Sequence, residues 1–146
     1  MLFAVSMSVL LFYGCKKLTE EHNAVTDDIL NKTLAEVISS NSDLSTFAKY
    51  LVQTGYDKEI SSSKNYTVFA PVNSALATLD AAVVNDPVKL KKFVGNHIAI
   101  QLYSVKNVTS LTRIVMLNGK YNNMQGSRID EANISSADKY ASNGIL

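Results

Sequence analysis

Residues 66–76 of the chain read YTVFAPVNSAL. The first five residues are dense in β-branched and aromatic side chains, which predicts a buried strand with Val68 and Phe69 in the core. Pro71 has no backbone N–H to donate to a sheet, so we expect the strand to end there. Asn73 is a residue type that favours the N-cap, and we expect it to cap the helix that follows. That helix would place Leu76, Leu79 and Val83 on one side.

Two amphipathic helices are predicted before this strand. Residues 26–39 begin with a threonine that can act as N-cap, and residues 43–54 can be capped by Ser42 or Asp43. Gly55 is placed to end the second helix, because glycine readily adopts the left-handed conformation found at many helix ends. The apolar residues that share a face are Leu30, Leu34, Val37 and Ile38 in the first helix, and Leu44, Phe47, Ala48 and Leu51 in the second.

A further helix is predicted from Asp86, which suits the N-cap, and Pro87, which suits the first helical position. Its apolar face would carry Leu90, Phe93, Val94 and His97. At this spacing we expect His97 to be a core residue with one ring nitrogen bonded to the backbone. We interpret the lysines of this helix as a solvated face, with contact to anionic glycans as the alternative. These lysines are Lys89, Lys91 and Lys92.

Strands dominate the sequence after this helix. The candidate strand regions are 98–108, 113–117, 120–124 and 127–134. Asn118-Gly119 joins the middle two as a hairpin, since Asn-Gly favours the turn with positive φ at both central residues. Helices come first and strands last, with further helices inserted after the first strand. This order predicts an α+β fold rather than a doubly wound parallel sheet.

The composition fits a single globular domain. The chain has 146 residues, and 14 Lys and Arg against 13 Asp and Glu give a net charge of +1. That balance argues against a nucleic-acid-binding protein, which would be strongly basic. A single Cys excludes a disulfide framework and a Cys-rich zinc site, and no glycine-rich phosphate loop occurs. We therefore expect no cofactor, no metal ion and no small-molecule substrate.

Catalytic chemistry has few candidate residues. A nucleophilic mechanism needs a Ser or Cys with a His and a carboxylate in reach. The only Cys belongs to the N-terminal segment, where His22 also lies. The acidic pairs Asp27-Asp28 and Asp130-Glu131 are adjacent in sequence, so their side chains should point apart rather than across a cleft. The sequence therefore predicts a protein that is not an enzyme.

The N-terminal segment has the pattern of an export signal. Residues 2–13 form an apolar run without charge, which is shorter than the roughly 20 residues that a membrane-spanning helix needs. The run stops at Gly14-Cys15, which resembles a bacterial lipoprotein cleavage site, so Cys15 is the predicted site of lipidation. The alternative is an ordinary cleaved signal, or an anchoring stretch with an incidental cysteine. The chain then divides into a signal peptide at 1–14, a polar tether at 15–25 and a domain at 26–146.

The block at 66–76 resembles the first conserved block of the fasciclin-type domain. The positions that match are Thr67, Val68, Phe69, Ala70, Pro71, Asn73 and Ala75. Further similarity covers a leading helix, a helix that ends in a histidine, an Asn-Gly turn and the start of the second conserved block. These positions are Leu44, Ser45, Phe47, Leu51 and Gly55, then Leu90 to His97, Asn118 and Gly119, and finally Asn143, Gly144 and Ile145.

The resemblance implies helices packed on a β-sandwich or wedge of mostly antiparallel strands. In the family the second conserved block continues into a closing strand, and here the sequence stops at Leu146. We therefore expect a domain that is incomplete at its C-terminus, with a truncated final strand. Asn143-Gly144 is expected to form a turn, and strands next to the closing strand are expected to lose hydrogen-bond partners.

The resemblance also implies a non-catalytic adhesion or interaction module, which meets protein or polysaccharide partners. With Cys15 lipidated, the protein would be an outer-membrane lipoprotein on the periplasmic or cell-surface side. The alternative is an accessory lipoprotein of a bacterial glycan-binding or uptake system. An aromatic platform would favour that alternative, and the candidates for exposed aromatic residues are Tyr103, Tyr121 and Tyr140.

Overall fold

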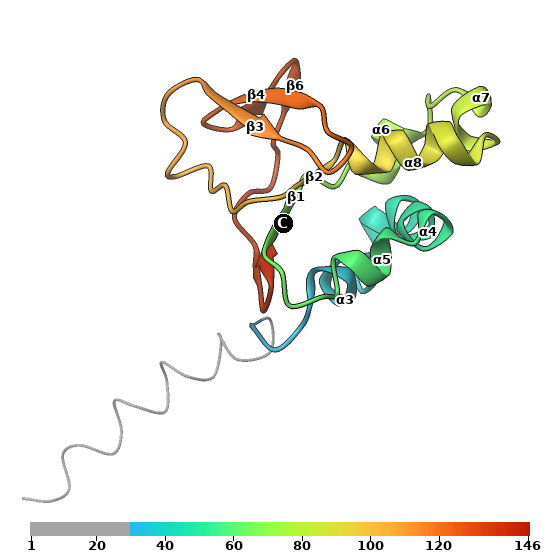
Figure 1. Cartoon of the computed structure of the whole chain (residues 1–146), viewed down its shortest axis with the longest axis horizontal. Coiled ribbons are helices and arrows are strands. Elements are labelled where there is room, and N and C mark those ends of the chain that lie inside the picture. The colour runs from blue at the N-terminus through green and yellow to red at the C-terminus, as the bar shows by residue number, and fades with distance from the viewer. Residues whose placement is uncertain (1–29) are drawn as a thin grey trace, which may run out of the picture.

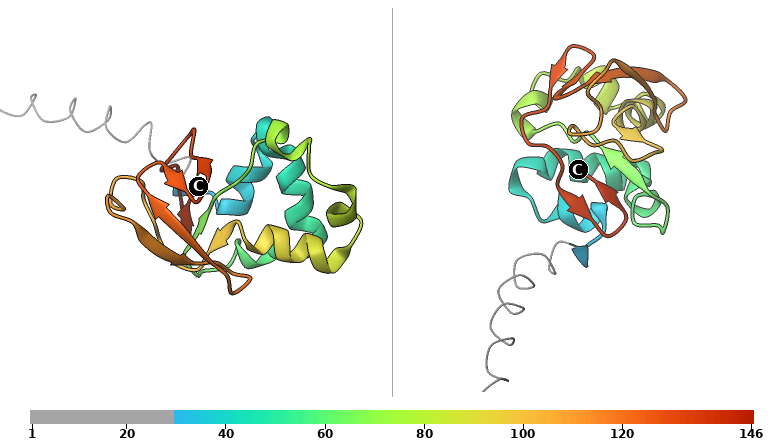
Figure 2. Two further views of the ribbon diagram at one scale, coloured as in Figure 1. Left: turned by 90° about the horizontal axis from the view of Figure 1, so that it is seen from above. Right: turned by 90° about the vertical axis from the view of Figure 1, so that its left-hand side faces the viewer.

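The computed structural model describes residues 30–146. Helices gather on one side of the molecule and most strands on the other (Figure 1), and the view from above shows the same separation (Figure 2, left). In chain order the first elements are α3 (Leu34–Ser39), the 3-10 turn η1 (Ser42–Leu44), α4 (Ser45–Thr54), α5 (Tyr56–Glu59), β1 (Tyr66–Val68), α6 (Asn73–Leu76), α7 (Ala81–Val84) and α8 (Pro87–Gly95). Strands follow: β2 (Ile98–Ala99), β3 (Thr112–Val115), β4 (Tyr121–Gln125), β5 (Arg128–Ile129), β6 (Ala132–Asn133), β7 (Tyr140–Ala141) and β8 (Gly144–Ile145).

The strands form two four-stranded sheets. The first has the order β2-β1-β8-β7, with β1 antiparallel to β2 and parallel to β8. The second has the order β3-β4-β5-β6, and every pair in it is antiparallel. An isolated bridge between Ala99 and Met116 connects the two sheets. The predicted α+β class is confirmed, with helices on two sheets of mostly antiparallel strands.

Two clusters of buried side chains hold these layers together. The larger cluster joins α3, α4 and α8 to the first sheet, and it contains Leu34, Ile38, Phe47, Leu51, Val68, Leu90, Val94 and Ile98. The smaller cluster lies under the second sheet and contains Ala99, Val108, Ile114, Met116 and Met124. Burial alternates along β4, so the strand presents Met124 to the core and its neighbours to solvent.

The first predicted helix is shorter than expected. Its first four residues lie outside the described part of the chain, and α3 begins only after Thr33. Thr33 is extended, and its side chain forms a capping box with Glu36. This local cap satisfies the amide groups at the start of α3, and Leu30, before it, is 44% exposed rather than buried.

The start of the second helix also differs from the prediction. Asn41, not Ser42 or Asp43, supplies the side-chain cap, and it caps the 3-10 turn that precedes α4. The predicted end is confirmed, because Gly55 has φ +73° at the C-cap of α4. The predicted buried face is confirmed for Leu44, Phe47 and Leu51, with Ala48 half-buried beside them.

The strand in the 66–76 block ends earlier than Pro71. It ends at Val68, and Phe69 is only half-buried, packing against the smaller cluster. The single helix expected afterwards is two one-turn helices, α6 and α7, because Asp80 caps a new turn at α7. The helix from Asp86 and Pro87 is confirmed, with the Asp86 side chain accepting from two amide groups of the first turn.

The later strands are shorter than predicted. Region 98–108 contributes only β2, and region 127–134 folds into the two short strands β5 and β6. The hairpin around Asn118-Gly119 is confirmed, but its turn is different. Asn118 does not have positive φ, whereas Gly119 has φ +82°, and its N–H donates to the carbonyl of Met116. This is the three-residue loop with a glycine in the left-handed region.

The last residues of the sequence enter the first sheet. Gly144 pairs with Tyr66, and Ile145 pairs with Thr67, so β8 lies between β1 and β7. The expected loss of partners therefore does not apply to Tyr66 and Thr67. The turn predicted at Asn143-Gly144 lies one residue earlier, at Ser142–Asn143, where it joins β7 to β8, and Gly144 is already part of the strand.

Candidate interaction groove

A groove of about 770 Å³ opens beside the exit from β1. It lies where this exit meets η1, the β5–β6 hairpin and the end of β8. In Figures 1 and 2 the end of β8 lies in the interior of the fold, between strands and helices. The segment Val68 to Val72 forms one wall, and Leu44, Ile129, Ile134 and Leu146 add apolar surface. We call this the β1-exit groove.

The charges at the β1-exit groove are mostly acidic. Asp43, Asp130 and Glu131 line it, against a single lysine, Lys139. The carboxylate of Asp130 accepts from the backbone N–H of Asn123 at 2.9 Å. Within residues 30–146, no ion pair forms at Asp43, Glu131 or Lys139. The groove therefore combines an apolar wall with a surplus of uncompensated carboxylates.

The backbone of the segment that leads into the groove is bonded on both sides. Tyr66 donates its N–H toward β8, to the carbonyl of Asn143 at 3.2 Å, and Phe69 donates toward β2, to the carbonyl of His97 at 2.8 Å.

His97 lies at one end of the groove, just after α8. Its Nδ1 donates to the carbonyl of Phe93 at 2.9 Å, as the sequence predicts. Its ring packs on two aromatic rings, with centroids 4.6 Å from Phe93 and 5.7 Å from Phe47. Burial lowers the pKa of His97, and the bond to the Phe93 carbonyl opposes this shift only partly. The imidazole is thus held neutral and oriented by packing.

Asn73 caps a helix, but not the helix that follows it. The N-cap of α6 is Val72, and Asn73 makes no cap bond there. Instead its Oδ1 accepts from the backbone N–H of Thr46 in the first turn of α4 at 2.9 Å. Its Nδ2 donates to the Ser42 carbonyl at 2.8 Å and to the Ser45 hydroxyl at 3.1 Å. Asn73 therefore fastens the start of α4 to the wall of the groove.

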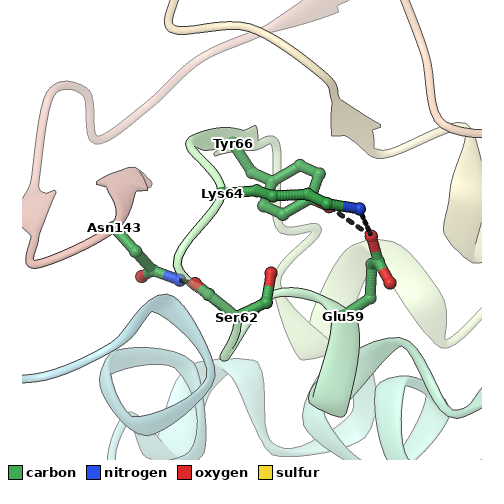
Figure 3. A network of polar contacts seen from close by, with 5 residues as sticks. All are labelled: Glu59, Ser62, Lys64, Tyr66 and Asn143. Carbon is green, nitrogen blue, oxygen red and sulfur yellow. Dashed lines mark hydrogen bonds and ion pairs between the residues drawn. The ribbon is translucent and has the colours of Figure 1, made fainter.

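Asn143 is buried, and its side chain joins segments that are distant in sequence (Figure 3). Its Oδ1 accepts from the N–H of Leu34 at 2.9 Å, which caps the start of α3. Its Nδ2 donates to the carbonyls of Ile60 at 2.7 Å and Ser62 at 2.8 Å. Gly144 follows at a point without room for a side chain, because a Cβ there would be 2.1 Å from the Tyr66 carbonyl oxygen. Both residues position β8 against β1.

A second polar contact in Figure 3 supports the start of β1. The hydroxyl of Tyr66 donates to the carboxylate of Glu59, which also pairs with Lys64 at 3.3 Å. Burial and this bond raise the pKa of Tyr66 to about 12. The bond from Tyr66 lowers the pKa of Glu59. The hydroxyl thus stays protonated and structural at physiological pH.

Thr67 holds the segment after β2 rather than lining the groove. Its hydroxyl donates to the carbonyl of Gln101 and accepts from the N–H of Tyr103, both at 2.8 Å. A similar anchor further along the chain is Asp138, whose carboxylate accepts from the Ser104 hydroxyl and the Val105 N–H, both at 2.9 Å. No local pattern marks such long-range bonds, so the role of Asp138 could not be predicted.

The structure separates the predicted family residues into two groups. Those that line the groove are Val68, Phe69, Ala70, Pro71 and His97. Those that hold the surrounding framework are Thr67, Asn73, Asn143 and Gly144. Cys15 lies outside the described residues. The sequence did not predict that acidic residues line the groove, because these residues come from loops far apart in the chain.

Two further properties concern only residues 30–146. No group of three or more His, Cys, Asp or Glu side chains is arranged to hold a metal ion there. In the same range, none of the helices has the length and apolar character needed to cross a bilayer.

Comparisons with known proteins agree with this architecture. The chain is 27% identical over 89 residues to a FAS1 domain-containing protein of Saccharomyces cerevisiae, spanning 60% of this chain and only 10% of that protein. A solved FAS1 domain pair of the insect cell adhesion molecule fasciclin I superposes with a TM-score of 0.60 at 15% identity, over 78% of this chain and 48% of that structure. The fasciclin domain model matches residues 42–146. Fasciclin domains are generally adhesion-related, non-catalytic modules. The chain therefore belongs to the fasciclin domain family.

Proposed function

We propose that this protein is a lipid-anchored interaction module of the bacterial cell envelope that contacts a partner macromolecule through its fasciclin domain. The observation that carries the proposal is the family match over residues 42–146. The insect fasciclin I, whose domain pair shares the fold, is a cell adhesion molecule. The β1-exit groove offers a preformed surface for such contact, because it is concave and partly apolar.

The anchoring part of the proposal rests on the sequence before the domain. Residues 2–13 are apolar and uncharged, and Gly14-Cys15 follows directly. A thiol at this position can carry a diacylglycerol thioether, and two or more acyl chains together give stable membrane attachment. Such an anchor would hold the domain at the membrane surface, at the end of the short polar segment 15–25.

A glycan-binding role has no specific support from the described residues. Tyr121 and Tyr140 are exposed as predicted, but Tyr103 is half-buried with its hydroxyl bonded to Gln101. Arg113 covers the ring of Tyr121 at 3.8 Å from its centroid, and none of the three tyrosines lines the groove. Since none of these tyrosines contributes to the groove, we favour a polypeptide partner for that surface.

The test has an anchoring arm and an adhesion arm, both using the full-length chain expressed in a bacterium. Wild type should appear in the membrane fraction with the added mass of a diacylglycerol, whereas Cys15→Ser should be soluble and unmodified. Thr19→Ser changes the same segment without removing the thiol and serves as the matched control. Unmodified, soluble wild-type protein would refute the anchor.

The adhesion arm compares cells that display the protein with cells that carry Cys15→Ser. Binding is measured to surfaces coated with envelope proteins or with envelope polysaccharide. We expect wild type and Thr19→Ser cells to adhere to the protein-coated surface and Cys15→Ser cells to lose adhesion. Equal adhesion by all three strains would contradict a surface role for this chain.

A further inference from the structure

We propose that the outer face of the second sheet binds an acidic polypeptide segment of a partner protein, through carboxylates that pair with Arg113 and Arg128. This inference rests on the proposed function, because it names the chemistry of a partner that an interaction module would meet. The surface belongs to β3, β4 and β5, whereas β1 and β8 are in the other sheet. We call it the arginine face, and it consists of Leu111, Arg113, Tyr121, Asn123, Gln125 and Arg128.

The strand register places these side chains together. Residues directly opposite each other in an antiparallel pair point to the same side of a sheet, and here Arg113 lies opposite Asn123. On the other side of β4, Gln125 lies opposite Arg128. Burial alternates along β4, so Asn123 and Gln125 share its exposed side. All six residues of the arginine face are exposed, and Figure 1 shows β3 and β4 on the side of the molecule away from α4.

The first support is the charge of this surface. Arg113 and Arg128 are the two arginines of the whole sequence, and both belong to the arginine face. Within residues 30–146, neither of them forms an ion pair. One carboxylate, that of Asp130, lies at the margin, where it accepts from the N–H of Asn123 at 2.9 Å. Two guanidinium groups against one carboxylate leave a surplus of positive charge, which complements the carboxylates of an acidic partner.

Contacts within the sheet already orient both guanidinium groups. The guanidinium of Arg113 lies over the ring of Tyr121, 3.8 Å from its centroid, and this stacking leaves the N–H groups in its plane available. The Nε of Arg128 donates to the carbonyl of Asp130 at 3.0 Å. Among the described residues, the terminal N–H groups of both arginines have no hydrogen-bond partner. A side chain that is oriented beforehand loses less entropy when it forms the paired bonds of an arginine to a carboxylate.

The second support is a hollow in this surface beside Arg128. It has a volume of about 350 Å³ and is lined by Leu111, Asn123, Gln125, Arg128 and Asp130. Leu111 is 69% exposed, so an apolar side chain placed in the hollow would remove leucine surface from water. The side-chain amide of Gln125 has no hydrogen-bond partner within residues 30–146, and it can both donate to and accept from a peptide backbone.

The residue types of the arginine face are those of a protein interface. Tyrosine and arginine are enriched at the centres of such interfaces, whereas lysine is depleted. Most of the 14 cationic residues of the chain are lysines, yet this surface carries both arginines next to the exposed Tyr121. Composition therefore favours an acidic polypeptide over an acidic polysaccharide.

The register also sets the spacing of the partner's carboxylates. Arg113 and Arg128 lie two strands apart and are offset by two residues along the strands, so their Cα atoms are about 12 Å from each other. In an extended peptide, residues i and i+4 point to the same side and lie about 13 Å apart. We therefore expect a segment with acidic residues at i and i+4 and an apolar residue at i+2, which would meet the hollow.

The probe for this proposal is the peptide Gly-Ser-Glu-Thr-Leu-Thr-Glu-Ser-Gly, amidated at its C-terminus and labelled at its N-terminus with an uncharged dye. Anisotropy is measured with the full chain in micelles of a non-ionic detergent. We expect saturable binding with a Kd below about 1 mM. The control peptide Gly-Ser-Glu-Glu-Leu-Thr-Thr-Ser-Gly has the same composition with adjacent glutamates, and a second control has glutamine in place of both glutamates. Each control should bind at least about fivefold more weakly.

Matched variants locate the site. Arg113→Gln and Arg128→Gln each remove one charge from the arginine face, and Lys58→Gln removes one from an exposed position on α5. Leu111→Ser removes exposed apolar surface from the hollow, and Val52→Ser does so on α4. We expect only the variants of the arginine face to weaken probe binding, by at least about fivefold. Arg113→Lys keeps the charge but loses the planar fork, so it should also bind more weakly than wild type. Circular dichroism checks that all variants are folded.

Several results would overturn the inference. They are absence of probe binding, equal affinity for the peptide with adjacent glutamates, or equal effects of face and control variants. Calorimetry that shows tighter binding of trigalacturonic acid than of the probe, lost in Arg113→Gln, would make an acidic polysaccharide the occupant instead. A dimer that Arg113→Gln but not Lys58→Gln dissociates in sedimentation would assign the surface to a second copy of the chain. Since probe binding does not depend on lipidation, its failure is separable from failure of the anchor or of cell adhesion.

Discussion

Replacement of Asn143 by alanine should be among the most destabilising single changes in this fold. The side chain is buried and satisfies the N–H of Leu34 and the carbonyl of Ile60, both in buried bonds. Alanine would leave both groups unpaired, at a cost of about 1–3 kcal/mol each. The carbonyl of Ser62 is only partly buried and can find water, so it adds little. We expect a loss of about 2–6 kcal/mol in the free energy of unfolding.

That loss is a large fraction of the 5–15 kcal/mol typical of a whole domain. Urea unfolding followed by far-ultraviolet circular dichroism measures it, with the denaturant slope unchanged if the transition stays two-state. The control is Asn107→Ala, at an exposed asparagine whose side chain makes no bond within residues 30–146. It should change stability by less than about 0.5 kcal/mol.

The reasoning would be refuted by a loss below about 1 kcal/mol for Asn143→Ala, because the two buried groups would then have found other partners. Asn143→Asp sharpens the test. It keeps an acceptor for Leu34 but turns a carboxylate toward the carbonyls of Ile60 and Ser62. We expect it to be no more stable than the alanine variant at neutral pH, and to recover part of the loss on acidification.

Three further predictions concern the framework of the groove. Gly144→Ala would bring a Cβ to 2.1 Å from the Tyr66 carbonyl oxygen, and it should lower the free energy of unfolding, measured in urea, by about 3 kcal/mol or more. Gly119 has φ +82° but open space around it, so Gly119→Ala should lower it by only about 1–2 kcal/mol. Asn73→Ala should cost about 1 kcal/mol through loss of the α4 cap, and Asn73→Asp, which keeps the acceptor, should cost less by the same measurement. Burial lowers the pKa of His97 below its ordinary 6.5, so the unfolded chain binds the proton more readily than the folded chain. Stability should therefore fall as the pH drops below about 6.5. A urea midpoint that is flat between pH 7 and 5, or that depends equally on pH in His97→Gln, would contradict this.

Local patterns correctly predicted two helix termini. Asp86 and Pro87 begin α8, and Gly55 ends α4, because these residues satisfy or adopt the terminal geometry of their own helix. His97 was also predicted correctly, as a packed ring with one nitrogen bonded to the backbone. In each case the interaction joins residues at most four positions apart, so its partner can be found in the sequence.

The roles of Asn73 and Asn143 show where local reasoning ends. Asn73 has the chemistry of a helix cap, as predicted, but the amide that it satisfies belongs to Thr46 on another helix. Asn143 was expected in a turn, and it lies in one, yet its amide group joins three segments that are distant in sequence. An amide side chain bonds equally well to any backbone group that folding brings near, and the sequence does not say which.

The motif at 67–75 indicated the family by resemblance. Residue types and their spacing predicted the α+β class, a buried strand that begins at Tyr66, and the helix termini at Gly55 and Asp86. These follow from backbone preference and hydrophobic periodicity, which act over a few residues. Only the tertiary structure decided that β8 pairs in parallel with β1 and that three carboxylates line the groove beside the exit from β1. The groove is made by loops far apart in the chain, and its shape and charge exist only once packing of the two cores brings those loops together.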